Sequence, residues 1–137
     1  VAATDVQLDL KGLNFLLAED NELNAEILSE ILASEGAHCD VAENGQIAVD
    51  KFLAAPPHTY GAVLMDIMMP VLNGYDACKL IRASKHPEAQ SIPVVAMTAN
   101  AFVKDVQDAL DAGMNAHIAK PINMETLKST LASCIRR

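Results

Sequence analysis

Short apolar runs alternate along the chain with longer segments in which apolar residues recur at helical spacing. Most runs are bounded by Gly, Pro or acidic residues, so they predict buried strands, while the longer segments predict amphipathic helices. The predicted strands cover 13–18, 38–42, 62–66, 93–98 and 117–119. The predicted helices run from Asn21 to Gly36, from Gly45 to Pro56, and over 75–83, 101–112 and 124–135.

Capping and turn residues lie where these elements meet. Asn21 is predicted to cap the first helix, because its short side chain can accept a hydrogen bond from a backbone N–H of the first turn. Gly36 and Gly113 are predicted to end the first and fourth helices, since glycine readily adopts the left-handed conformation found after helices. Asn73-Gly74 predicts a turn before the third helix.

Strand and helix alternate five times, which predicts one α/β domain with a five-stranded parallel sheet and five helices. Apolar parallel strands are covered by helices on both faces through right-handed crossovers, so we expect a doubly wound sheet. Residues 1–12 lack sustained periodicity and are interpreted as a linker remnant, and 13–137 as the domain. The start at Val1 instead of Met suggests a processed chain or a piece of a longer protein.

Composition and charge exclude several classes of function. No apolar run reaches the length of a membrane span, and no signal peptide opens the chain, so we expect a cytoplasmic domain without membrane contact. The net charge of −8 argues against direct nucleic-acid binding, which needs a basic surface. Cys39, Cys78 and Cys134 are scattered and odd in number, which is typical of free thiols in a reducing compartment and not of a zinc site.

Chemically active side chains follow four of the five predicted strands. Glu19-Asp20 come after the first strand, Asp66 ends the third, Thr98 ends the fourth and Lys120 follows the fifth. All carboxyl ends of parallel strands lie at one edge of the sheet, where open α/β sheets bind their ligands. We therefore expect three carboxylates, one hydroxyl and one ammonium group to converge.

Such a cluster predicts a site for a divalent cation. Two carboxylates about 4 Å apart repel by about 4 kcal/mol at an effective dielectric constant near 20. Three of them with one Lys remain anionic, and Mg²⁺ suits them because it binds a few carboxylate oxygens and keeps several waters; Mn²⁺ is an alternative. Asp66 could then act as a nucleophile toward phosphorus, while Thr98 and Lys120 stabilise the charge on the phosphoryl oxygens.

The chain resembles the receiver domain of response regulators and hybrid sensor histidine kinases in two-component systems. The matching motifs are Glu19-Asp20-Asn21, Met65 to Pro70 with Asn73-Gly74, Thr98-Ala99 and Lys120-Pro121. They occur in the family's order and at compatible spacing over nearly the whole chain. The sequence around Asn115-Ala116-His117 is most similar to that of receivers of hybrid kinases.

The resemblance implies a flavodoxin-like sheet of order 2-1-3-4-5 and a phosphoryl donor that is a histidine on a partner, either a histidine kinase or a histidine phosphotransfer domain. It implies that Asp66 is the phosphoacceptor and that Glu19, Asp20, Asp66 and the backbone carbonyl of Met68 bind the metal. The phosphoryl group would contact Thr98, the backbone of Ala99 and Lys120, with a cis peptide between Lys120 and Pro121. A monomer is favoured.

The resemblance also implies a switch, and the positions of two further residues suggest a control of phosphoryl lifetime. His117 occupies the family's switch position, and we hypothesise that it moves inward when Thr98 turns toward the phosphoryl group. Met68 and Asn100, two residues beyond Asp66 and Thr98, could control the access of water to the phosphorylated aspartate.

Four other functions fit parts of the sequence. A magnesium phosphatase with an aspartyl nucleophile would usually carry an acid two residues after Asp66, where this chain has Met68. A flavodoxin-like nucleotide or flavin binder would need a Gly-, Ser- or Thr-rich loop in place of the acidic Glu19-Asp20-Asn21-Glu22. A phosphorylation-independent interaction domain would lack one of the key groups. A free-standing single-domain regulator remains an alternative to the receiver part of a hybrid kinase.

Overall fold

The computed structural model describes residues 10–69, 71–98, 103–119 and 123–135. Within them, strands and helices alternate five times. The strands are β1 (Asn14–Ala18), β2 (His38–Ala42), β3 (Ala62–Asp66), β4 (Val94–Thr98) and β5 (Ala116–Ala119). The helices are α1 (Glu22–Ser34), α2 (Gly45–Ala54), α3 (Gly74–Ala83), α4 (Val103–Asp111) and α5 (Met124–Ile135). The predicted alternation is confirmed.

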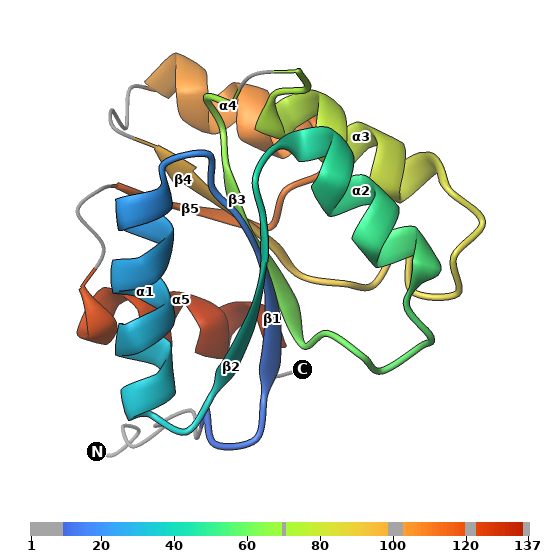
Figure 1. Ribbon diagram of the computed structural model, residues 1–137. Helices are drawn as coiled ribbons and strands as arrows, with labels where there is room; N and C mark the ends of the chain where they lie inside the picture. The colour runs from blue at the N-terminus through green and yellow to red at the C-terminus, as the bar shows by residue number, and fades with distance from the viewer. Residues whose placement is uncertain (1–9, 70, 99–102, 120–122, 136–137) are drawn as a thin grey trace.

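The five strands form one parallel sheet in the order β2-β1-β3-β4-β5. Helices α1 and α5 cover one face, and α2, α3 and α4 cover the other (Figure 1). Side chains alternate along β1 to match: Leu16 and Ala18 pack with the core under α2 and α3, whereas Phe15 and Leu17 pack with that under α1 and α5. The predicted doubly wound, flavodoxin-like sheet is therefore confirmed.

Four asparagines begin helices at the end of the sheet where the strands finish, namely Asn21, Asn44, Asn73 and Asn123. The side chain of Asn21 accepts a hydrogen bond from the backbone N–H of Asn24 (2.9 Å), which confirms the predicted cap of α1. Asn44 and Asn73 cap α2 and α3 in the same way. Gly36 (φ 84°) and Gly113 (φ 98°) adopt the left-handed conformation after α1 and α4, as predicted. Each cap fixes where the chain enters its helix after leaving the sheet.

Some apolar residues that recur at helical spacing in the sequence are exposed in the structure. Ile27 in α1, Leu53 in α2 and Leu110 in α4 have 48%, 44% and 52% of their surface exposed. Each is the neighbour in sequence of a buried residue, and one residue corresponds to a rotation of about 100° around a helix. The buried face of each of these helices is therefore narrower than the set of apolar residues at helical spacing.

The packed part of the chain includes a residue from the predicted linker segment 1–12. Leu10 is 1% exposed and belongs to the core under α1 and α5. The backbone N–H of Gly12 donates to the carbonyl of Gly36 at 2.9 Å, which ties this segment to the end of α1. Residues 1–9 lie outside the described part of the chain, and the division at residue 12 stays a prediction.

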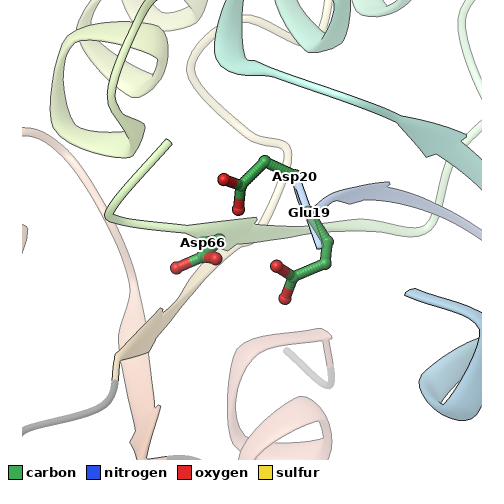
Figure 2. Close-up of side chains that lie close together, drawn as sticks. All are labelled: Glu19, Asp20 and Asp66. Atoms are coloured by element: carbon green, nitrogen blue, oxygen red, sulfur yellow. The ribbon is translucent and has the colours of Figure 1, made fainter. Parts of the chain in front are cut away.

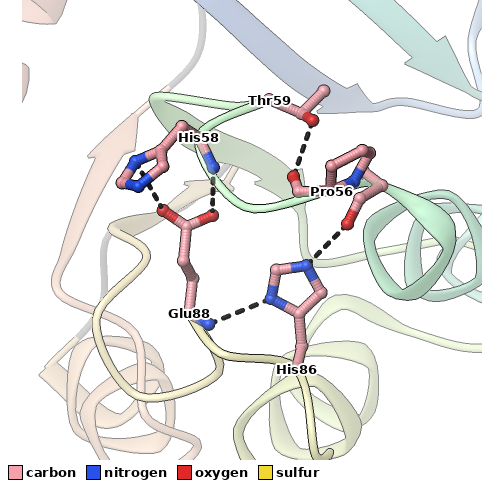
Figure 3. Close-up of polar contacts among 6 residues, drawn as sticks. Pro56, His58, Thr59, His86 and Glu88 are labelled. Atoms are coloured by element: carbon pink, nitrogen blue, oxygen red, sulfur yellow. Dashed lines mark hydrogen bonds and ion pairs between the residues drawn. The ribbon is translucent and has the colours of Figure 1, made fainter.

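At the end of the sheet where the strands begin, polar contacts join the loop before β3 to the loop before β4 (Figure 3). The carboxylate of Glu88 accepts a hydrogen bond from the backbone N–H of His58 at 3.1 Å, and its other oxygen lies 3.8 Å from the His58 ring. The ring of His86 contacts the Glu88 backbone N–H and the carbonyl of Ala55. These contacts fix the loops that lead into the two central strands.

Asp40 on β2 links three elements and gives a first testable prediction. Its carboxylate accepts hydrogen bonds from Tyr60 (2.6 Å) and Lys51 (2.8 Å). Burial opposes ionisation, but these two bonds outweigh it and lower the pKa of Asp40 below its usual value; burial and the neighbouring carboxylate raise the pKa of Tyr60. Asp40→Asn should lower the free energy of unfolding at pH 7 by about 1 kcal/mol, a value reduced by solvent screening.

The pH dependence of this loss follows from the lowered pKa. A carboxyl group of this kind contributes stability above its unfolded pKa of about 3.9, and that contribution disappears as the pH falls through the folded pKa. Denaturant unfolding of both proteins should therefore show a constant difference above pH about 5 that shrinks below pH about 4. Asp50→Asn, on the exposed side of α2, is the matched control. A difference that persisted at low pH would contradict this role.

Candidate functional site

Three carboxylates meet where β1 and β3 end. The two strands are neighbours with Ala18 opposite Met65, so Glu19 and Asp20 leave β1 beside Asp66 at the end of β3. One oxygen of each carboxylate lies within 4.8 Å of the others. Figure 2 shows the three side chains gathered at the ends of these strands. The predicted convergence of the three acids is confirmed.

The three acids have different environments. Glu19 and Asp66 are 4% and 5% exposed, whereas Asp20 is exposed to solvent. The Glu19 carboxylate accepts a hydrogen bond from the backbone N–H of Asn21 (3.1 Å), and that of Asp66 accepts one from Met68 (3.3 Å). Two acids are therefore held in place by local backbone, and the third opens the cluster to solvent.

This arrangement fits a hard divalent cation. Carboxylate oxygens are the ligands that Mg²⁺ prefers, and it needs only one or two of them beside waters and phosphate oxygens. A bound cation relieves the mutual repulsion of the carboxylates, whereas a bound anion would add to it. The exposed side of the cluster leaves room for further ligands. Glu19, Asp20 and Asp66 could thus hold Mg²⁺ together.

Thr98 ends β4 next to this cluster. In the register of β3 and β4, Asp66 lies opposite Met97, and the backbone N–H of Ile67 donates to the Met97 carbonyl at 3.1 Å. Thr98 is one residue further along and is 8% exposed. Lys120 comes directly after the end of β5 in sequence, but Lys120, Pro121, Ala99 and Asn100 lie outside the described residues.

His117 and Met68 lie at different distances from the acids. His117 is half-buried in β5, opposite Ala96 and two residues before the strand ends, so it lies below the edge that carries the acids. Met68 is 77% exposed in the loop that follows Asp66, whereas Met65 is fully buried in the core. Met68 thus gives the loop an apolar side chain two residues after Asp66, where the phosphatase alternative would usually carry an acid.

Sequence reasoning assigned no role at the site to Gly74 beyond a turn. A Cβ atom on Gly74 would lie 2.4 Å from the carbonyl oxygen of Asp66, a distance that real Cβ contacts essentially never show. The backbone N–H of Gly74 donates to the Ile67 carbonyl at 2.9 Å. Gly74 thus lets the start of α3 pack directly against the backbone of the central acid. The Asn-Gly pair was the available signal, but it indicated only a turn.

Comparisons with known proteins agree on one family. The family model of the response regulator receiver domain matches residues 15–132. The peroxide stress-activated histidine kinase mak1 of Schizosaccharomyces pombe is 34% identical over 125 residues, which cover 90% of this chain and 8% of that protein. The chain spans 3% to 15% of the length of the curated relatives it matches.

Solved structures give the same result. The receiver domain of the sensor histidine kinase PA1611 from Pseudomonas aeruginosa PAO1, with a magnesium ion in its active-site cleft, is 36% identical with a TM-score of 0.81, covering 92% of this chain and 99% of that one. The receiver domain of Ssk1 in complex with the phosphotransfer protein Ypd1 of Saccharomyces cerevisiae is 29% identical with a TM-score of 0.79, covering 94% and 92%. In the described part of the chain, none of the helices combines the length and the apolar character that a membrane span requires.

Proposed function

Because the chain belongs to the response regulator receiver domain family, we propose that it accepts a phosphoryl group from a phosphohistidine partner on Asp66 in a magnesium-dependent reaction. The observation that carries this proposal is the group of three carboxylates at the ends of β1 and β3. The receiver structure with magnesium in its cleft supports the choice of ion. The donor is inferred from the Ssk1 receiver, which binds a histidine phosphotransfer protein.

The proposed metal ligands are Glu19, Asp20, Asp66 and the backbone carbonyl of Met68. When bound, Mg²⁺ supplies positive charge for the phosphoryl oxygens. An Asp66 oxygen attacks phosphorus, the bond from phosphorus to the histidine nitrogen breaks, and the imidazole leaves with the electron pair and takes a proton from water. Hydrolysis then removes the phosphoryl group: water attacks phosphorus, the bond from phosphorus to the Asp66 oxygen breaks, and phosphate and the Asp66 carboxylate are released.

Thr98, Lys120 and His117 complete the proposed site. The Thr98 hydroxyl donates to a phosphoryl oxygen, the ammonium group of Lys120 pairs with another, and the Ala99 backbone N–H adds a hydrogen bond. Once Thr98 turns toward the phosphoryl group, the half-buried His117 moves inward and biases the surface made by α4, β5 and α5. An unchanged His117 rotamer in a beryllofluoride-bound structure would contradict this switch.

The isolated domain would catalyse only its own phosphorylation and dephosphorylation. The position two residues after Asp66 holds Met68 and not an acid that could activate water for turnover of external substrates. This supports a signalling role over the phosphatase alternative. We propose that the chain is the receiver part of a hybrid histidine kinase in a reducing cytoplasm, a setting consistent with the free thiols of Cys39, Cys78 and Cys134. The free-standing regulator is the alternative.

Incubation with acetyl phosphate and Mg²⁺, followed by intact mass measurement, tests the proposal. We expect the chain to gain one phosphoryl group when Mg²⁺ is present, and to gain none when the ion is removed by a chelator. A parallel incubation with Mn²⁺ examines whether the site accepts that ion. No gain with either ion would contradict the proposed function.

The side chains of Met68 and Asn100 should set the lifetime of the phosphorylated state. Met68 is an exposed apolar group in the loop directly beyond Asp66, so we expect it to restrict the approach of water to phosphorus. Replacing Met68 and Asn100 together by small residues should change the hydrolysis rate by about ten-fold, less than the roughly 10²- to 10⁴-fold of general acid–base catalysis, because neither side chain is an acid or a base. Loss of the phosphoryl mass over time measures this rate. An unchanged rate would contradict the role of both residues.

A further inference from the structure

The loop between β3 and α3 begins at Ile67, directly after Asp66, and ends at Asn73, the cap of α3. Two contacts hold its ends. The backbone N–H of Met68 donates to the Asp66 carboxylate at 3.3 Å, and that of Gly74 donates to the Ile67 carbonyl at 2.9 Å. The first contact is made to the acid itself, so a displacement of the loop that reaches Met68 changes the surroundings of Asp66.

Val71 in this loop has an unusual backbone conformation. Its φ is 71°, in the left-handed region that β-branched residues rarely adopt. Its side chain is 80% exposed, so burial of apolar surface does not compensate for the strained backbone. Strain of this kind persists only where surrounding contacts determine the conformation, and such residues cluster at functional sites. Pro70 lies outside the described residues, so the contact that bears on Val71 is one made by the residue that follows it.

The next residue, Leu72, makes such a contact with α2. A Cβ atom on Gly45, the first residue of α2, would lie 2.1 Å from the Leu72 carbonyl oxygen and 3.0 Å from its carbon. Gly45 is buried, and Asn44 fixes the start of the helix by accepting a hydrogen bond from Ile47 at 2.8 Å. The first turn of α2 thus lies directly against the carbonyl of the residue that follows the strained Val71.

We infer that Gly45 and Val71 are positioning residues for the phosphoacceptor site. The first turn of α2 supports the Leu72 carbonyl, which keeps Val71 left-handed and holds the Met68 backbone N–H against Asp66. A residue far from the acids in sequence thereby sets the geometry of the carboxylate and of the adjacent Met68 backbone. The inference deepens the proposed function and rests on it.

Gly45→Ala tests the support directly, with Gly61→Ala as its matched control. A Cβ on Gly61 would have its nearest neighbour, Leu13 Cδ2, at 3.5 Å, which is ordinary van der Waals contact. We expect Gly45→Ala to weaken Mg²⁺ binding about ten-fold and to slow phosphorylation by acetyl phosphate, since displacements of about 1 Å at a reacting group have large effects. Gly61→Ala should change neither. Titration of amide chemical shifts with Mg²⁺ gives both the affinity and the shift of the Met68 amide.

A second pair of variants tests the strain even if Gly45→Ala does not fold. Val71→Gly should melt at a higher temperature than Val71→Ala, because alanine is penalised at positive φ whereas glycine is not. At an ordinary loop position the order is the reverse, since glycine makes the unfolded chain more flexible. The reverse order here would overturn the strain at Val71 and with it the inference.

The double variant Gly45→Ala/Val71→Gly tests whether the two residues act together. Glycine at 71 lets the Leu72 carbonyl move away from the added methyl group, so Mg²⁺ affinity should recover most of the loss, whereas Gly45→Ala/Val71→Thr should not recover it. Additive effects, or a Gly45→Ala protein that binds Mg²⁺ as Gly61→Ala does, would overturn the inference. A native chain that takes no phosphoryl group would overturn the proposed function instead, so the two failures are distinguishable.

Discussion

Replacing Asp66 with asparagine should abolish the gain of a phosphoryl group from acetyl phosphate and leave the domain folded. The amide has nearly the shape of the carboxylate but lacks its nucleophilic oxygen, so the acceptor chemistry is lost. Because Asp66 is 5% exposed beside two other acids, removing its charge should also raise the free energy of unfolding by about 1–3 kcal/mol without Mg²⁺. Intact mass and denaturant unfolding measure the two effects.

The opposite signs of these effects separate function from folding. A variant that loses phosphorylation because it unfolds would be less stable, whereas Asp66→Asn should be more stable than the native chain. Asp50→Asn, on the exposed side of α2, should keep full phosphorylation. Phosphoryl incorporation by Asp66→Asn to the native extent would show that another residue is the acceptor.

Replacing Asp20 with asparagine should weaken Mg²⁺ binding by about a hundred-fold or more. Substitution of residues that merely orient metal ligands costs about ten- to a hundred-fold in affinity, so loss of a direct carboxylate ligand should cost no less. Asp20 is the better test than Glu19, because Asp20 is exposed and Glu19 is buried and holds the backbone N–H of Asn21. Calorimetric titration with Mg²⁺ measures the change.

Glu22→Gln is the matched control for the Asp20 variant. Glu22 is an exposed acid in the first turn of α1, close in sequence but outside the group of three carboxylates. It removes the same charge without removing a proposed ligand, so its Mg²⁺ affinity should stay within about two-fold of the native value, the residual effect of an exposed charge. Equal losses in the two variants would mean that general negative charge, and not a built site, binds the ion.

The fold followed from the sequence because each level of the pattern agreed with the next. The apolar runs that became β3 and β4 are buried on both faces, which is what a parallel sheet under two layers of helices requires. Asn21, Gly36 and Gly113 act at the helix ends where the sequence placed them. The acids could be grouped in advance because all strand ends of a parallel sheet share one edge.

Close approaches between segments that are far apart in the chain could not be predicted from the sequence. The contact of Gly45 with the Leu72 carbonyl joins the start of α2 to the loop after β3, two segments that local propensity treats separately, and nothing in an Asn-Gly pair indicates it. The left-handed Val71 contradicts local preference, because tertiary contacts override it. The rotation of each helix on the sheet, which leaves Ile27 exposed, also depends on packing.

Chemical mapping of the phosphorylated residue tests the central claim most directly. Borohydride reduces an acyl phosphate to an alcohol, which converts a phosphorylated aspartate to homoserine and leaves unmodified carboxylates unchanged. After incubation with acetyl phosphate and Mg²⁺, peptide mass spectrometry should find homoserine at position 66 and aspartate or glutamate at positions 19 and 20. Homoserine at position 20, or a phosphoryl group retained on a histidine, would contradict the assignment of Asp66 as the phosphoacceptor.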